Sequence, residues 1–233
     1  TAVNFVTSGG VMIPPTCTTG VVPGDSRCTV KIRSQNPRVA AHRGRVQILA
    51  YAAGEEDFVD ANFNNVYDCG EGWSDLTTAF RDDNENRVFD TGEFSVPRAP
   101  SASACASAAT PSPTGGDGVW GTVDVRAQGT IIFATSGAVI RGAIAGNALN
   151  FTIADGNGNS MPTGSTVEVT GAVGNSSGSW LTCNIQSNSS FAIANTVAPT
   201  ITSSQFLCDS GDILTVKVTS PIGVTTSQGF IVP

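Results

Sequence analysis

Two twelve-residue segments carry acidic or amide side chains at alternate positions and end on a glutamate. The first is DANFNNVYDCGE, from Asp60 to Glu71, and the second is DDNENRVFDTGE, from Asp82 to Glu93. Calcium takes six to eight oxygen ligands, and a loop of this length supplies them from positions 1, 3, 5, 7, 9 and 12. Position 7 contributes its backbone carbonyl, and the acid at position 12 contributes both carboxylate oxygens. The chemistry that this spacing indicates is calcium binding.

Every ligand position of both loops holds a suitable oxygen. The predicted ligands are Asp60, Asn62, Asn64, Val66 (through its carbonyl), Asp68 and Glu71 in the first loop, and Asp82, Asn84, Asn86, Val88 (through its carbonyl), Asp90 and Glu93 in the second. The loops start 22 residues apart, in a segment (55–93) that contains twelve of the nineteen acidic residues. Two calcium ions would bring four positive charges to this crowded segment, so we expect two bound ions.

Two features distinguish these loops from those of a calcium sensor. Position 6 is normally glycine because the chain turns sharply there, whereas these loops have Asn65 and Arg87. Arginine tolerates left-handed geometry less well than asparagine, so we expect the second loop to bind more weakly. The flanking segments GEEDFV and WSDLTTAF are too short to form stable helices, which favours rigid cages over a switch. The neighbouring Glu56, Asp57 and Asp75 are either additional ligands or ordinary surface acids.

The chain contains six cysteines: Cys17, Cys28, Cys69, Cys105, Cys183 and Cys208. They form no C-x-x-C pair and the chain has one histidine, which argues against a zinc site. An even number of cysteines in a strand-rich chain indicates disulfide bonds and an oxidising compartment. Of the fifteen possible pairings, proximity and domain placement favour Cys17–Cys28, Cys69–Cys105 and Cys183–Cys208. The alternative is six reduced thiols in a cytosolic protein.

The elements that must hold these groups are β-strands. Apolar and polar residues alternate in CTVKIRSQ, GRVQILAYA and STVEVTGAV, and no segment shows a sustained helical period. The predicted fold class is therefore all-β, with two immunoglobulin-like (Ig-like) antiparallel β-sandwiches. The first spans 1–130 and includes an acidic insertion at 54–97 and an Ala/Ser/Pro-rich loop at 98–117. The second spans 131–233.

Charge and motifs exclude several classes of function. The net charge of −7 argues against nucleic acid as a partner, and no apolar run approaches the roughly 18 residues of a membrane span. The chain has no G-x-S-x-G elbow, phosphate-binding loop or G-x-G-x-x-G motif. We therefore expect no enzymatic activity. Glycoside hydrolysis by paired carboxylates is a distant alternative, because the spacing of the acids is that of metal ligands.

The segment GRVQILAYAAGEEDFVDANFNNVYDCGEGWSDLTTAFRDDNENRVFDTGEF resembles the calcium-loop insertion of bacterial Ig-like surface proteins of the invasin/intimin (Big) type. VNFVTSGG and the strands that follow it are similar to the middle and last strands of such a domain. FTIADGNGNSMPTGSTVEV is similar to a strand–turn–strand near its start. The resemblance implies secreted or surface-displayed sandwiches, often in tandem, with structural or adhesive roles and no catalysis.

The resemblance also implies that the first domain lacks its two opening strands. Such a domain exposes strand edges and apolar core unless another segment covers them. Either the chain is a piece of a longer protein, or a neighbouring chain supplies strands by β-augmentation, which would make this a filament subunit. We expect an extracellular structural or adhesive protein of the bacterial cell surface, whose partners are copies of itself or neighbouring Ig-like domains. The alternative is a calcium-bearing carbohydrate-binding module that presents Trp73, Trp120 or Trp180 to surface glycans.

Overall fold

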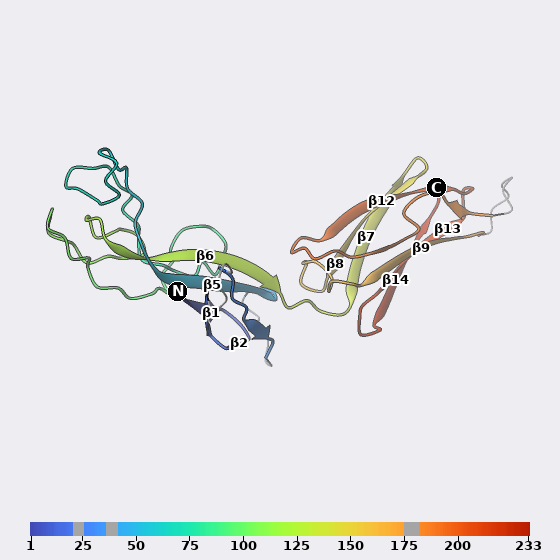
Figure 1. The fold of residues 1–233 in the computed structure, drawn as a ribbon. Coiled ribbons are helices and arrows are strands. Elements are labelled where there is room, and N and C mark those ends of the chain that lie inside the picture. The colour runs from blue at the N-terminus through green and yellow to red at the C-terminus, as the bar shows by residue number, and fades with distance from the viewer. Residues whose placement is uncertain (21–25, 36–41, 175–181) are drawn as a thin grey trace. The chain divides into compact units, whose positions relative to one another are not determined.

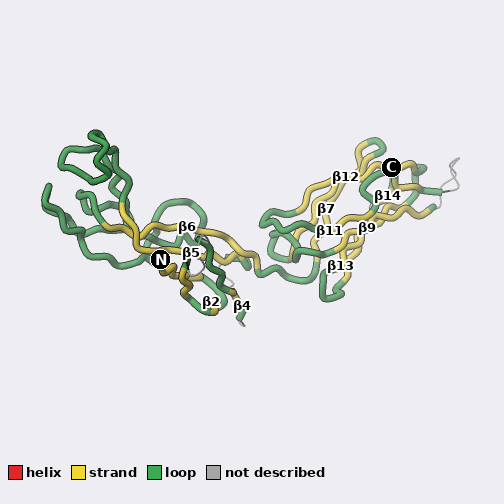
Figure 2. Tube along the Cα trace, viewed as in Figure 1, coloured by secondary structure: helices red, strands yellow, loops and turns green. Residues whose placement is uncertain are grey.

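The computed structural model describes residues 1–20, 26–35, 42–174 and 182–233. Figure 1 shows that these residues form strands and loops, and Figure 2 shows no helix among them, so the prediction of an all-β protein is confirmed. The chain divides into two compact units, which we call unit 1 (Thr1–Ile131) and unit 2 (Ile132–Pro233). In these described ranges, no helix has the length and apolar character needed to cross a membrane.

Unit 1 is built on a four-stranded sheet and a two-stranded ladder. Its strands are β1 (Ala2–Thr7), β2 (Val11–Ile13), β3 (Thr16–Thr18), β4 (Lys31–Arg33), β5 (Arg45–Glu55) and β6 (Thr122–Ile132), the last of which ends just past the boundary between the units. The sheet has the order β3-β1-β5-β6, and β2 pairs with β4. Because side chains alternate along a strand, Val46 and Leu49 point to opposite faces of β5. Both are 1% exposed, so each face of this strand is covered at some point along its length.

The acidic insertion and the loop after it connect β5 to β6. Among the described residues, this connection contains only isolated bridges, which pair Phe58 with Trp73, Phe80 with Ser95, and Ser112 with Gly115. Ala79 and Val96 of the connection pack against Leu49 of β5 in a small apolar cluster. The insertion therefore covers the face of the unit 1 sheet that carries Leu49.

Unit 2 consists of two four-stranded sheets around one apolar core, which confirms the prediction of a β-sandwich for this unit. Its strands are β7 (Ala138–Ala145), β8 (Ala148–Asp155), β9 (Thr166–Ala172), β10 (Asn184–Ile185), β11 (Ser190–Ala192), β12 (Thr200–Leu207), β13 (Ile213–Thr219) and β14 (Thr225–Ile231). The sheets have the orders β10-β12-β8-β7 and β11-β9-β13-β14. On β13, Leu214, Val216 and Val218 are at most 1% exposed, whereas Lys217 between them faces outward. This alternation places one face of the strand in the core.

All six cysteines form disulfide bonds, and none is free. The pairs are Cys17–Cys28, Cys69–Cys105 and Cys183–Cys208, as proximity in the sequence indicated. Two bonds lie in unit 1 and one lies in unit 2. The interpretation of these residues as reduced thiols is therefore wrong for this structure.

Candidate metal centres

Loop 1, the segment from Asp60 to Glu71, folds around its own predicted ligands. Oδ1 of Asp60 accepts a hydrogen bond of 3.2 Å from the backbone N–H of Asn64. The side-chain amides of Asn62 and Asn64 both donate to Oδ2 of Asp68, at 2.7 and 2.8 Å. The side chains at positions 3 and 5 therefore lie beside the carboxylate at position 9, and the carboxylate at position 1 lies beside the backbone of position 5.

Glu71 closes loop 1 from its last position. One of its carboxylate oxygens accepts from the backbone N–H of Ala61 at 2.8 Å, and the other accepts from the N–H of Asp68 at 2.9 Å. The N–H of Val66 donates to the side-chain oxygen of Asn64 at 2.7 Å, which folds position 7 back over position 5. The structure thus brings together the residues that sequence spacing assigned to this loop.

Loop 2, the segment from Asp82 to Glu93, repeats this arrangement. The amides of Asn84 and Asn86 donate to Oδ2 of Asp90, at 2.8 and 2.7 Å. The backbone N–H of Asn86 donates to Oδ1 of Asp82 at 3.1 Å, and the N–H of the following residue donates to the other oxygen at 2.7 Å. Glu93 again accepts from the N–H groups at positions 2 and 9, at 2.6 and 2.9 Å. The two loops are therefore structural copies of one another.

The backbone is left-handed at the same three positions of both loops. These are position 4 (Phe63, φ 61°; Glu85, φ 63°), position 6 (Asn65, φ 61°; Arg87, φ 67°) and position 11 (Gly70, φ 100°; Gly92, φ 106°). A non-glycine residue in this region costs on the order of 1–3 kcal/mol and persists only where its surroundings impose it. The carboxylate at position 1 supplies that constraint by accepting the N–H groups at positions 5 and 6.

Replacing Arg87 by glycine is expected to stabilise unit 1 by about 0.5–1 kcal/mol. A residue with a β-carbon is strained in the left-handed conformation, whereas glycine adopts it without strain. Glycine also makes the unfolded chain more flexible, which offsets only part of this stabilisation. Asn65→Gly is the matched control in loop 1 and should gain less, since asparagine tolerates this geometry. Urea unfolding in EDTA measures both changes. Equal gains in the two loops would contradict the assignment of strain to the arginine.

The donor set of each loop suits calcium. Each offers three carboxylates, two amide oxygens and the carbonyl of Val66 or Val88. Hard oxygens of this kind and number are what calcium takes. Among the described residues, one group of three histidine, cysteine or carboxylate side chains has all its ligand atoms within 4.8 Å of one another, namely Cys183, Cys208 and Asp212, so the three carboxylates of each loop lie further apart than this. The two sulfurs of that group are joined in a disulfide, so it is no metal site.

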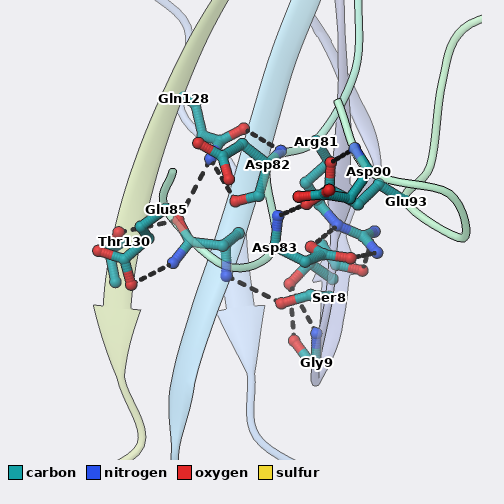
Figure 3. A network of polar contacts seen from close by, with 12 residues as sticks. Ser8, Gly9, Arg81, Asp82, Asp83, Glu85, Asp90, Glu93, Gln128 and Thr130 are labelled. Atoms are coloured by element: carbon teal, nitrogen blue, oxygen red, sulfur yellow. Dashed lines mark hydrogen bonds and ion pairs between the residues drawn. The ribbon is translucent and has the colours of Figure 1, made fainter. Parts of the chain in front are cut away.

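Glu85 anchors loop 2 to the sheet of unit 1 through hydrogen bonds (Figure 3). Its carboxylate accepts from Nη2 of Arg45 at 2.6 Å and from Nε2 of Gln47 at 2.9 Å, both on β5. Gln47 is 1% exposed, and its side-chain oxygen accepts from the hydroxyl of Thr130 on β6 at 2.8 Å. The sequence alone does not indicate this role, because the partners are distant in the chain and Glu85 falls between ligand positions.

Gln128 and Arg81 fix the start of loop 2. The side-chain oxygen of Gln128 accepts from the N–H of Asp82 at 2.9 Å, and its amide donates to the carbonyl of the same residue at 2.8 Å (Figure 3). Arg81 donates to both carboxylate oxygens of Asp83, at 2.6 and 2.9 Å, and to the carbonyl of Thr7 at 2.8 Å. The carboxylates of Asp83 and Glu85 therefore serve as anchors, and neither of them is at a predicted ligand position.

Substitution of Glu85 by glutamine is expected to weaken the acid sensitivity of unit 1. Hydrogen bonds from Arg45 hold the pKa of Glu85 below its ordinary value of 4.5, although partial burial opposes them. A carboxyl group with a depressed pKa stabilises the folded state above its unfolded pKa, and this contribution is lost as the pH falls through the folded pKa. Melting temperatures in EDTA should therefore fall more steeply below about pH 4.5 for the wild type than for Glu85→Gln. Parallel pH profiles would contradict this role of Glu85.

Loop 1 is held by aromatic packing and a disulfide. The ring of Tyr67 stacks on Trp120 with centroids 4.8 Å apart, and Phe58 meets both rings edge-on. Cys69, next to the predicted ligand at position 9, is bonded to Cys105 in the Ala/Ser/Pro-rich loop. The two calcium-loop candidates are thus anchored differently, loop 1 by side-chain packing and a covalent bond, and loop 2 by polar contacts to strands.

The tryptophans proposed for glycan contact have structural partners where the structure describes them. Trp120 is half-buried, and its indole N–H donates to the carbonyl of Glu56 at 2.8 Å. Trp73 is half-buried and pairs with Phe58 through a backbone bridge. Trp180 lies outside the described residues. Ring packing and a hydrogen bond therefore account for Trp120, and a backbone bridge places Trp73.

Of the three neighbouring acids, Glu56 has a clear structural role. It is 3% exposed, and its carboxylate accepts from the N–H groups of Leu76 (2.7 Å) and Gly121 (3.1 Å). Burial raises the pKa of Glu56, although these two hydrogen bonds oppose the rise. Asp75 accepts from the N–H of Gly118 at 3.1 Å, and Asp57 is exposed. Glu56 and Asp75 organise the connection around the loops, a role the sequence analysis missed.

Comparison with known protein families, curated proteins and solved structures finds no match to this chain. The chemistry of the two loops therefore stands on the residues described above. Their repeated ligand spacing, repeated backbone conformation and repeated hydrogen bonds are the features from which a function can be argued.

Proposed function

We propose that this protein is an extracellular structural protein of the bacterial surface whose first unit is rigidified by two calcium ions. The observation that carries the proposal is the repetition of one loop geometry at Asp60–Glu71 and Asp82–Glu93. In each loop the side-chain amides at positions 3 and 5 donate to the carboxylate at position 9, and the same three backbone positions are left-handed. Two loops with the same geometry are expected where each loop binds the same kind of ion.

In this proposal, each ion is held by the six oxygen-bearing positions of its loop. The residues would be Asp60, Asn62, Asn64, Val66, Asp68 and Glu71 for one ion, and Asp82, Asn84, Asn86, Val88, Asp90 and Glu93 for the other. Six carboxylates in two short loops repel one another, and calcium would relieve that repulsion while cross-linking each loop. Loop 2 is fixed to β5 and β6 through Glu85 and Gln128, so calcium there would stiffen the unit as a whole.

The strand order of unit 2 supports an Ig-like assignment. Its eight strands fall into the sheets β10-β12-β8-β7 and β11-β9-β13-β14. If β7, β8 and β9 are strands A, B and C, and β12, β13 and β14 are E, F and G, these sheets read D-E-B-A and C-F-G, with β11 added beside C. This is the order of an Ig constant-type sandwich with one additional edge strand.

The disulfides support a location outside the reducing cytoplasm. Three disulfide bonds in 233 residues are typical of proteins that fold in oxidising compartments. Together with the resemblance to invasin/intimin-type proteins, they favour a structural or adhesive role at the bacterial surface. The proposal includes assembly with copies of the same chain through added β-strands.

Equilibrium dialysis against radioactive calcium tests the proposed sites directly. The wild-type protein should bind two ions, and Asp60→Ala and Asp82→Ala should each bind one, because each substitution removes the position 1 ligand of one loop. Asp57→Ala, an exposed acid outside the ligand pattern, is the matched control and should still bind two. Binding of no calcium by the wild type would reject the proposal. Glycan binding that is lost on Trp73→Ala would favour a carbohydrate-binding module instead.

A further inference from the structure

The six strands of unit 1 correspond, in chain order and in pairing, to the last six strands of unit 2. The sheet β3-β1-β5-β6 has the same connectivity as β11-β9-β13-β14, and the ladder β2–β4 has the same connectivity as β10–β12. Unit 2 has two strands in addition, β7 and β8, which complete the sheet of β10 and β12. Among the described residues, unit 1 has no counterpart of β7 or β8.

Backbone hydrogen bonds identify the face of the unit 1 sheet that corresponds to the core face of unit 2. The N–H of Phe5 on β1 donates to the carbonyl of Pro15 beside β3, and the N–H of Val169 on β9 donates to the carbonyl of Ser189 beside β11. Both residues therefore hydrogen-bond toward the equivalent edge strand, which places their side chains on equivalent faces. Ala50 lies opposite Phe5, as Val216 lies opposite Val169.

In unit 2, β7 and β8 cover this face. Leu149, Phe151 and Ile153 of β8 are at most 2% exposed and belong to the same core as the inward side chains of β13. The strand β7 reaches the far edge, where the N–H of Ala138 donates to the hydroxyl of Thr226 on β14 at 3.1 Å. Two strands of eight residues each thus close the sandwich over the whole sheet.

In unit 1, the equivalent face carries an open apolar groove. It has a volume of about 280 Å³ and is lined on this face by Val3, Ala50, Ala52, Val125 and Ala127, from β1, β5 and β6. Val125 on β6 is 43% exposed, whereas Phe230 on β14, the counterpart of β6, packs against the core of unit 2. The insertion covers the opposite face, where Leu49 packs. The edge of β4 that faces away from β2 has no strand partner within the described part of the chain.

We infer that this groove and the open edge of β4 form an acceptor site for a β-hairpin equivalent to β7–β8, supplied by a neighbouring chain. Its inner strand would pair with β4 and place apolar side chains at alternate positions into the groove, as Leu149, Phe151 and Ile153 do in unit 2. Among the described residues, the strands β1 to β14 are each paired within their own unit, so none of them is available to fill this site. The inference rests on the assembly role proposed above and specifies its contact.

Binding of a synthetic hairpin to the full 233-residue protein tests this inference. The probe is a fluorescent peptide with the sequence of residues 138–155, followed by fluorescence anisotropy in calcium-containing buffer. Wild-type protein should bind it saturably, and a peptide carrying Phe151→Asp should bind at least tenfold more weakly. Ala50→Glu and Val125→Glu, in the groove, should each weaken binding of the unmodified peptide at least tenfold. Ala53→Glu, an exposed position on the opposite face of β5, is the matched control and should leave binding unchanged.

Absence of binding to the wild-type protein, or equal losses in the Ala50→Glu and Ala53→Glu variants, would overturn the acceptor site. Circular dichroism checks that each variant is folded. The intact mass of the native particle tests the source of the hairpin. We expect assemblies of several chains. A single chain that closes unit 1 with residues of its own would contradict the inference that a neighbouring chain supplies the hairpin. Because the groove lies on the face opposite the insertion, loss of calcium binding in dialysis and loss of peptide binding are separate results.

Discussion

Chelation of calcium is expected to lower the melting temperature of unit 1 by about 10–20 °C. A ligand that binds only the folded state stabilises it by about 2.7 kcal/mol at a hundredfold excess over its dissociation constant, so two ions would contribute roughly 5 kcal/mol. In a unit of this size, each kcal/mol shifts the melting temperature by about 2–4 °C. Differential scanning calorimetry of calcium-loaded protein, with and without EDTA, measures the shift.

The two units and the two loops supply the controls for this experiment. The transition of unit 2, which contains neither loop, should not move on chelation. Asp60→Ala and Asp82→Ala should each retain part of the shift, since each leaves one loop intact. Asp82→Ala should retain more of the EDTA-induced shift than Asp60→Ala, because we expect Arg87 to make loop 2 the weaker calcium site. An EDTA-insensitive unit 1 transition in protein shown to start calcium-loaded would reject both sites.

Removal of the Cys69–Cys105 disulfide is expected to destabilise unit 1 by about 4 kcal/mol and to weaken calcium binding at loop 1. The bond joins residues 36 positions apart, and the chain-entropy model gives about 4 kcal/mol for a loop of this length. Cys69 directly follows the position 9 ligand of loop 1, so the bond also restrains the cage. The double variant Cys69→Ser/Cys105→Ser should therefore bind calcium normally at loop 2 and less tightly than the wild type at loop 1. Urea unfolding and calorimetric titration measure the two effects.

The Cys17–Cys28 bond is the matched control in the same unit. It joins residues 11 positions apart at β3, away from both loops in sequence, and its removal should cost about 3 kcal/mol with calcium affinity unchanged. Equal losses of calcium affinity in the two double variants would show that unit stability, and not local restraint of loop 1, is the cause. Unchanged affinity in both variants would show that the cage folds without covalent support.

The sequence predicted best those features whose determinants are local. Alternating ligands from Asp60 to Glu71 were recognised because the bonds that shape each loop join residues two to six positions apart, or ten for Glu71 and Ala61. Strand alternation around Val216 predicted the all-β class for the same reason, since side chains alternate with every residue of a strand. The close pairing Cys17–Cys28 likewise followed from proximity. These features need no knowledge of which strands become neighbours.

The tertiary structure decided what the local pattern leaves open. Glu85 and Asp83 look like further acids of a calcium-rich segment, but they anchor loop 2 because Arg45, Gln47 and Arg81 lie beside them. Glu56 looks like a surface acid, but it is buried beneath the connection. The contacts of Glu85 and Glu56 span 20 to 65 residues, and Arg81, which holds Asp83, reaches Thr7 across 74 residues. Chain entropy gives no local sign of which distant partner will be adjacent.

By itself, then, the sequence determined the strand content, the spacing of twelve oxygen donors and the resemblance to surface proteins, because each is set by neighbours along the chain. Only the tertiary structure decided which face of β5 the insertion covers and which face is left with an apolar groove at Ala50. A one-residue change of register would exchange those faces, so the outcome rests on the pairing of β1 with β5. That pairing joins segments more than forty residues apart, and no short stretch of sequence contains it.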